Sequence, residues 1–178
     1  MESKILGVLK QRDNVENWWT SAPTNVPLVE AQIPFTFMDY DAKNDPSFLE
    51  EAEKALANFI KLDSFYKLQI AQNVFENFVD YCSYIDEAGI PENMKGAQPL
   101  SIWNHIHPTQ VFLNRRESND KDIYVVLTCE CEWDKEHGLQ LVFRQGKKLT
   151  RVSDQDGHLT DSDAFGFDDK DDKLLSSF

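Results

Sequence analysis

The stretch from Asp122 to Gly157 reads DIYVVLTCECEWDKEHGLQLVFRQGKKLTRVSDQDG and decides the fold. Its first part alternates strictly between two sets of side chains, which is the period of an extended strand. One set is Ile123, Val125, Leu127, Cys129, Cys131 and Trp133. The other set is Tyr124, Val126, Thr128, Glu130, Glu132 and Asp134. We therefore predict a strand that buries the first set and turns the second set outward.

The same stretch contains two reversals of the chain. Gly138 ends a polar turn that begins at Asp134, and a glycine there can adopt the positive φ that a hairpin loop of this length needs. Leu139–Phe143 then returns as a second strand, and a turn at Gly146 leads into a third strand, Lys148–Val152. The pattern predicts a three-stranded antiparallel meander that carries the core of the domain.

Two helices are predicted upstream of the meander. The first covers Asp45–Leu62, with Asp45 as its N-cap and Pro46 at its first helical position. The second follows the capping residue Asp63 and covers Ser64–Ala88. In both segments, apolar side chains recur at steps of three and four residues, which predicts one buried face on each helix.

The N-terminal part of the chain is expected to add short strands. Lys4–Lys10 and Asn17–Ser21 fit strands, although the first of them also fits a helix over Glu2–Gln11. Val26–Ile33 and Phe35–Tyr40 are extended segments. We predict an α+β fold, in which an antiparallel sheet of N-terminal strands and the C-terminal meander carries the two helices on one face.

Length and charge limit the domain organisation and the classes of partner. The 178 residues suit one α+β domain, which we place at residues 1–165. The chain has 18 Lys and Arg against 31 Asp and Glu, so its formal net charge is −13. A field of this sign repels nucleic acids and anionic membranes and attracts a basic protein. Residues 166–178 are rich in aspartate and are predicted to form an acidic, partly mobile tail.

The cysteines and the N-terminus indicate a cytoplasmic protein. Cys129 and Cys131 lie two residues apart on one strand, where a direct disulfide would be strained, and Cys82 is the third cysteine. Reduced thiols in the cytosol are the simpler interpretation. The opening MESKILGVLKQRD is unlike a signal peptide, and no run of about 18 apolar residues predicts a membrane helix.

Five residues in and beside the first hairpin are the predicted partner-binding site: Glu130, Glu132, Asp134, Glu136 and His137. Carboxylates two residues apart on a strand are separated by roughly 7 Å, a distance that suits a metal ion or an acid–base pair. No nucleophile or phosphate-binding loop accompanies them, and the common catalytic motifs are absent from the sequence. We therefore predict no catalytic residues, and expect these side chains to contact a partner.

A calcium site is the alternative for the segment that follows the meander. Asp154, Asp156 and Asp163 partly match the calcium loop of an EF-hand, with Gly157 at the glycine position. Val152 falls at the first ligand position and has no side-chain oxygen. A turn held by aspartate side chains explains the same residues without a metal, and the prediction is otherwise of no cofactor.

Two histidines, His105 and His107, are also spaced to lie on one face of a strand. Such a pair could ligate zinc if an acid joined it, but the sequence does not identify a third ligand. A hydrogen-bonded pair of polar side chains is the favoured interpretation.

The segment CEWDKEHGLQLVFRQGKKLTRVSDQDGHLTD, which begins at Cys131, resembles a family of uncharacterised bacterial proteins. Their shared features are a C-x-W-[DE]-x-EHGL hairpin, a glycine turn and a DxDG segment. FLEEAEKALANFIKL and WWTSAP, earlier in the chain, are similar to the same family. Relatives of this kind occur in toxin–immunity neighbourhoods, so the resemblance implies an intracellular binding or immunity role. It brings no catalytic residue with it.

Together, these patterns lead to two functional hypotheses. The first is a non-enzymatic cytoplasmic protein-binding module, of immunity type, that neutralises a basic toxin through its acidic surface. The second is a metal-dependent enzyme or calcium-binding protein that uses the turn at Glu136 to Gly138 or the DQDG turn at Asp154 to Gly157.

Overall fold

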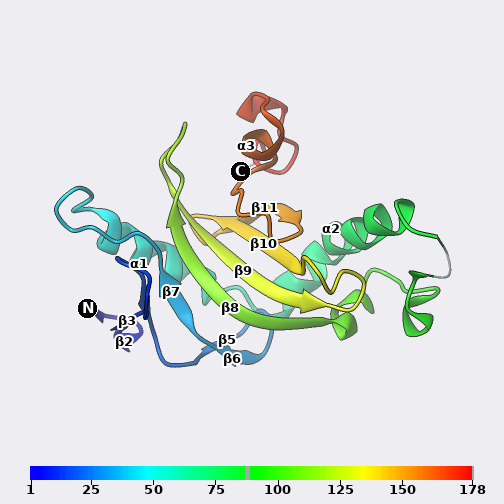
Figure 1. Ribbon diagram of the computed structural model, residues 1–178, viewed down its shortest axis with the longest axis horizontal. Helices are drawn as coiled ribbons and strands as arrows, with labels where there is room; N and C mark the ends of the chain where they lie inside the picture. The colour runs from blue at the N-terminus through cyan, green and yellow to red at the C-terminus, as the bar shows by residue number, and fades with distance from the viewer. Residues whose placement is uncertain (87–88, 178) are drawn as a thin grey trace.

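A seven-stranded sheet in the order β11-β10-β9-β8-β7-β4-β3 forms the centre of the computed structural model, which describes residues 1–86 and 89–177 (Figure 1). Its strands are β3 (Lys10–Gln11), β4 (Trp19–Thr20), β7 (Phe35–Phe37), β8 (Ile106–Arg115), β9 (Ile123–Cys131), β10 (Leu139–Arg144) and β11 (Lys148–Ser153). Two small hairpins pair β1 (Glu2–Ser3) with β2 (Gly7–Val8) and β5 (Thr24–Val26) with β6 (Ala31–Ile33). The predicted α+β class is confirmed.

The predicted meander is present with the expected core face. β9, β10 and β11 pair antiparallel in chain order, with Leu141 opposite Leu127 and Phe143 opposite Val125. The apolar set of β9 that we expected to be buried lies in the main hydrophobic core, together with Trp133 from the following loop. The local period of two was therefore sufficient to assign this face.

One pair of strands departs from the antiparallel arrangement. β7 and β8 run parallel, with Phe35 opposite Val111 and Phe37 opposite Leu113. Between these strands the chain forms both long helices, and a crossover of that length returns a strand in the same direction. The sheet is therefore mixed, because the N-terminal strands join the meander through this helical connection.

Helices α1 (Phe48–Phe59) and α2 (Ser64–Ser83) lie behind the sheet in Figure 1 and contribute to the same core. Asp63 caps α2 as expected, because its carboxylate accepts hydrogen bonds from the first turn. The predicted cap of α1 is wrong. Its N-cap is Ser47, and Asp45 instead binds the guanidinium of Arg115.

The end of α2 also differs from the prediction. The helix ends at Ser83, whereas the predicted end, Ala88, lies outside the described residues. No helix in the described part of the chain is long and apolar enough to cross a bilayer.

The second face of β9, expected to be solvated, is covered over most of its length. Tyr124 and Val126 are buried in a small cluster with Val142 of β10, and Leu159 and Leu175 close this cluster from the C-terminal segment. The C-terminal segment, residues 154–177, includes α3 (Asp161–Phe165) and a 3-10 helix (Asp169–Asp171), and it lies above the sheet in Figure 1. The residues predicted as a partly mobile tail thus pack on the sheet as far as Ser177, and Phe178 lies outside the described residues.

Two buried arginines hold this segment. Arg116 is 1% exposed and binds both oxygens of Asp163 and of Asp169, at distances of 2.7–2.8 Å, from its Nε and terminal nitrogens. Arg151 is 2% exposed; its terminal nitrogens bind Asp156 and its Nε binds Asp161. Four of the eight aspartates in the segment are therefore counter-charges for the two guanidinium groups, because a buried arginine needs hydrogen-bonded carboxylates around it.

These pairs predict how acid and mutation affect stability. The hydrogen bond from Arg116 lowers the pKa of Asp169 to about 2. The ionised carboxylate of Asp169 therefore makes its full contribution to the free energy of unfolding above pH ~4, and this contribution is lost as the pH falls through about 2. Asp169→Asn should lower the free energy of unfolding by about 1–3 kcal/mol at pH 7, because Arg116 keeps other carboxylates. Asp171→Asn, at an exposed position, is the control, with an expected change within about 0.5 kcal/mol. Denaturant melts at pH 7 and at pH ~2 measure both effects. A difference between Asp169→Asn and the parent protein that persists unchanged at the lower pH would contradict this assignment.

A second prediction concerns the turn between β10 and β11. Gly146 has a φ of 63°, and a Cβ there would lie 2.0 Å from the backbone oxygen of Ala55 in α1. Gly157 has a similar φ of 83° but open space around it. Gly157→Ala should therefore cost only the backbone strain, about 1 kcal/mol, whereas Gly146→Ala should cost about 3 kcal/mol or more in denaturant melts. Equal losses would mean that α1 does not pack against this turn.

Candidate functional site

The loop between β9 and β10 places several of the predicted site residues together. Asp134 is buried, and its carboxylate accepts a hydrogen bond from the backbone N–H of His137 at 3.0 Å. The same carboxylate lies 3.0 Å from Nδ1 of the exposed His137 ring, and this hydrogen bond raises the pKa of His137. Gly138 closes the loop with a φ of 68°. Hydrogen bonds within the loop thus hold its conformation. The carboxylate of Asp134 is used in these bonds and is not presented on the surface of the loop.

Glu132 is held by the two histidines that the sequence analysis considered as zinc ligands. One carboxylate oxygen lies 3.0 Å from Nδ1 of His105 and 2.7 Å from Nδ2 of Asn93. The other lies 3.7 Å from Nε2 of His107. The hydrogen bonds from His105 and then Asn93 lower the pKa of Glu132. The favoured interpretation of hydrogen-bonded polar side chains therefore holds for His105, whereas His107 is near the same carboxylate without a hydrogen bond to it.

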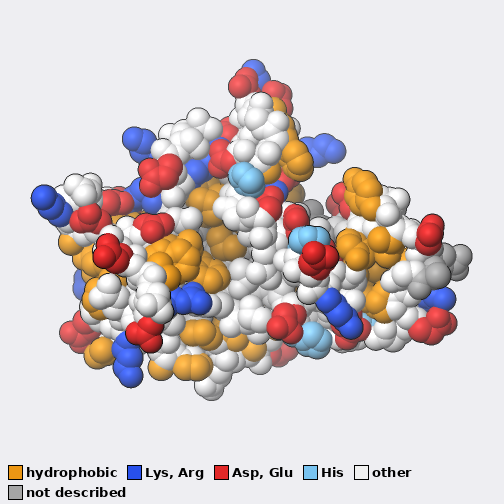
Figure 2. Space-filling view, in the orientation of Figure 1, with side chains coloured by type: hydrophobic (Ala, Val, Ile, Leu, Met, Phe, Trp, Pro, Cys, Tyr) orange, Lys and Arg blue, Asp and Glu red, His pale blue; other side chains and the backbone are white. Residues whose placement is uncertain are grey.

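Two hollows flank this loop. The edge groove, about 550 Å³, lies between α2, the loop, β11 and α3, and Figure 2 shows a notch in the outline where the C-terminal segment and the end of α2 face each other. The loop hollow, about 410 Å³, lies on the other side of Trp133 and Asp134 and is lined by Glu132, Glu136 and His137. In Figure 2, acidic side chains and histidines lie side by side over the ends of β8 and β9. The structure therefore gathers four of the five predicted partner-binding residues, whereas Glu130 lines neither hollow and is exposed at the end of β9.

The acids of the edge groove fall into two groups. Asp156 and Asp161 are bound to Arg151. Burial opposes ionisation of Asp156, but hydrogen bonds from Arg151 outweigh it and lower the pKa to about 2. Asp80 on α2 and Asp154 after β11 are exposed, and within residues 1–86 and 89–177 their carboxylates form no ion pair or hydrogen bond. These two carboxylates carry the charge that the groove can offer to a ligand.

Aromatic side chains complete the groove. Trp133 is buried at its base, where its Nε1 donates to Oδ1 of Asn77 at 3.2 Å. Tyr84, the C-cap residue that follows α2, and Phe165 of α3 are 84% and 74% exposed. Phe165 stacks on Phe167 with the rings 6° from parallel. Exposed aromatic rings are enriched at protein-binding surfaces.

The residues predicted as a calcium site do not converge. Asp156 is bound by Arg151 and Asp163 by Arg116, whereas Asp154 is free. Of the described residues, no group of three or more His, Cys, Asp or Glu side chains is placed to hold a metal ion. These contacts give no support to the calcium alternative, because Arg151 and Arg116 bind carboxylate oxygens that would have been ligands.

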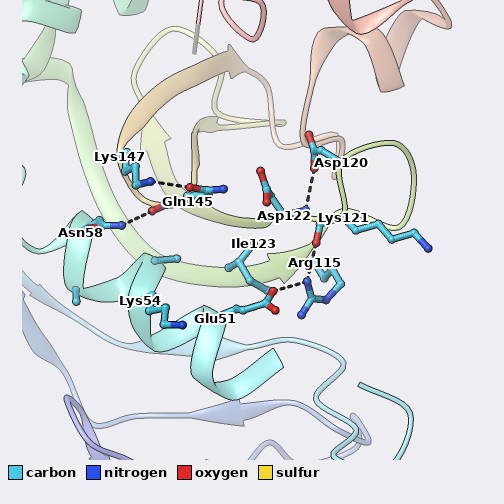
Figure 3. Close-up of a pocket in the computed structure, with 12 residues that line it drawn as sticks. Glu51, Lys54, Asn58, Arg115, Asp120, Lys121, Asp122, Ile123, Gln145 and Lys147 are labelled. Atoms are coloured by element: carbon cyan, nitrogen blue, oxygen red, sulfur yellow. Dashed lines mark hydrogen bonds and ion pairs between the residues drawn. The ribbon is translucent and has the colours of Figure 1, made fainter. Parts of the chain in front are cut away.

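A larger hollow, about 750 Å³, lies between α1 and the ends of the meander strands (Figure 3). Its polar groups already bind one another. Glu51 accepts from Arg115 at 2.8 Å, and the side-chain amide of Asn58 donates to the backbone oxygen of Gln145 at 3.0 Å. Lys147 donates to the Gln145 side chain at 2.8 Å. We interpret this hollow as part of the contact between α1 and the β10–β11 turn, and assign no ligand to it.

Comparison with known proteins identifies a family whose function is unknown. The family model "Domain of unknown function (DUF6985)" matches residues 5–159. The chain belongs to the DUF6985 family. No curated protein and no solved structure matches it. The expectation of an uncharacterised family is confirmed, and the match ends at Leu159, before α3 and the second wall of the edge groove.

Sequence reasoning missed the residues that α2 and α3 contribute to the site. Asp80 and Tyr84 are four residues apart, beside the apolar stripe used to predict the helix, so they lie on one face at the rim of the groove. An acid and an aromatic residue at this spacing are a signal that could have been noticed. The position of Phe165 depends on how the C-terminal segment folds back, for which the sequence holds no local signal.

The loop geometry gives a direct spectroscopic prediction. Because Asp134 binds the His137 ring, an NMR titration should give His137 a pKa above the ordinary value of ~6.5. Asp134→Asn should return it towards that value. Glu136→Gln is the control and should lower it less, because Glu136 acts only through its charge. An equal effect of the two variants would show that the hydrogen bond is not the cause.

Proposed function

We propose that this protein is a non-enzymatic, cytoplasmic binding protein that takes a basic protein partner in the edge groove. The specific form of the proposal is an immunity-type role in which the partner is a basic toxin. The observation that carries it is the convergence of free carboxylates, Asp80 and Asp154, with the exposed rings of Tyr84 and Phe165 around one hollow.

The distribution of charge supports a basic partner. The chain carries a net charge of −13, so a cationic protein is attracted before contact. Four of the eight aspartates in the C-terminal segment are paired with Arg116 or Arg151. A binding surface therefore has to use the acids that remain free, and two of these lie at the edge groove while Glu136 lies at the adjoining loop hollow.

The reactive groups of the described residues favour binding over catalysis. Desolvation raises the pKa of the Cys131 thiol to about 11, and burial likewise raises the pKa of Cys129 and Cys82. None of these thiols is therefore a thiolate at neutral pH. Glu132 and Asp134 are engaged by histidines and by the loop itself. These observations give no support to the alternative of an enzyme.

The test uses a pair of charge variants. Asp80→Asn with Asp154→Asn removes the two free charges of the groove, and Asp13→Asn with Glu16→Gln removes two exposed charges elsewhere. A partner captured from the source organism should associate about threefold to tenfold more slowly with the groove variant at low ionic strength, and should lose part of its salt dependence. The control should stay close to the parent protein. Stopped-flow association rates at about 50 and 500 mM salt measure this.

Two results would reject the proposal. One is a partner that distinguishes neither variant from the parent protein, which would place binding outside the edge groove. The other is turnover of a small substrate by the purified protein that is abolished by Glu132→Gln, because this residue would then act on a reacting group.

A further inference from the structure

The edge groove lies along the last strand of the sheet. β11 is the terminal strand, and the groove follows it from Arg151 to its end at Ser153 and continues to Asp154. One wall is α2, which packs on the core face of the sheet, and the other is α3, which packs on the opposite face with the C-terminal segment. Because the two walls lie on opposite faces of the sheet, the space between them runs along the outer edge of β11, next to the backbone of this strand.

The backbone groups of β11 can be assigned from its pairing. The N–H of Leu149 points away from β10, because it donates to the hydroxyl of Tyr66 on α2 at 3.0 Å. Leu149 lies opposite Phe143, and Val152 lies opposite Leu141, which is two residues away on β10. The two positions are three residues apart on β11, because the register shifts between Val142 and Phe143 and gives β11 one extra residue there. In an antiparallel pair, positions two residues apart have the same orientation. The N–H and C=O of Val152 therefore also point away from β10, into the groove, where no described side chain or loop bonds them.

We propose that the basic partner binds by adding an extended segment to β11 as a further strand. This inference rests on the proposed function and specifies its mode of recognition. Backbone hydrogen bonds to Val152 would provide affinity, and alternate side chains would provide specificity. The groove follows the last three residues of β11 and Asp154, which corresponds to a segment of about four residues, roughly 13 Å long.

The two walls determine the composition of that segment. Side chains that point towards α2 meet the free carboxylate of Asp80 and the ring of Tyr84, which suits Lys or Arg. Side chains that point towards α3 meet Phe165, since Asp161 is already bound to Arg151. The segment is therefore expected to alternate basic and apolar residues, with the basic ones on the α2 side.

The probe is a synthetic peptide of eight residues that alternates lysine and valine. Calorimetry measures its affinity, and hydrogen exchange followed by NMR measures protection of the Val152 amide. We expect binding together with slower exchange at Val152, and an affinity about tenfold lower for the same peptide N-methylated at alternate residues. A block peptide of four lysines and four valines is the composition control and should bind more weakly.

Variants of the protein separate the two proposals. Val152→Pro removes the N–H and should weaken the alternating peptide about tenfold, whereas Val152→Thr keeps the N–H and should not. The methylated peptide gives the same information if the proline variant fails to fold. If Asp80→Asn with Asp154→Asn weakens binding but N-methylation and Val152→Pro do not, strand addition is overturned and the acidic groove stands. If the alternating peptide fails to bind at millimolar concentration, strand addition is overturned, and the captured partner still tests the groove itself.

Discussion

Two buried guanidinium groups determine how the second face of the sheet is covered. Arg116 and Arg151 are the largest side chains that are almost fully buried. Removing an arginine from water is unfavourable by several kcal/mol unless carboxylates of suitable geometry surround it. Four of the five carboxylates around these arginines come from the C-terminal segment, and the fifth is Asp120. The segment contributes few apolar side chains of its own to this face, notably Leu159 and Leu175. The position of the segment is therefore set mainly by charge pairing, with a small apolar contact beneath it.

The same pairing shapes the candidate site. Arg151 binds Asp156 in the loop after β11 and Asp161 at the start of α3, so one guanidinium fixes the loop and the helix together. This places α3 beside the sheet edge as the second wall of the groove. The paired acids thus give the groove its form, and the acids that no arginine binds, Asp80 and Asp154, give it its charge.

Parts of the site that are continuous in sequence could be predicted, and parts assembled across the chain could not. Glu132 to His137 form one hairpin loop, so an alternating strand followed by a glycine turn was sufficient to place them together. The helix was recognised by its apolar stripe, and Asp80 lies outside that stripe. The prediction of a solvated acidic surface was also too simple for Asp134, because its carboxylate is used within the loop.

The sequence by itself determined the elements with a local period: the buried face of β9, the meander, and the two helices with the Asp63 cap of the second. Periodicity reports on burial because neighbouring residues share one element. Only the tertiary structure decided the parallel pairing of β7 with β8, the partners of Asp45, and the burial of Tyr124 under the C-terminal segment. An aspartate-rich segment has the same composition whether it is solvated or bound to arginines. What distinguishes the two states is whether distant guanidinium groups lose their water on folding, and that depends on the whole chain.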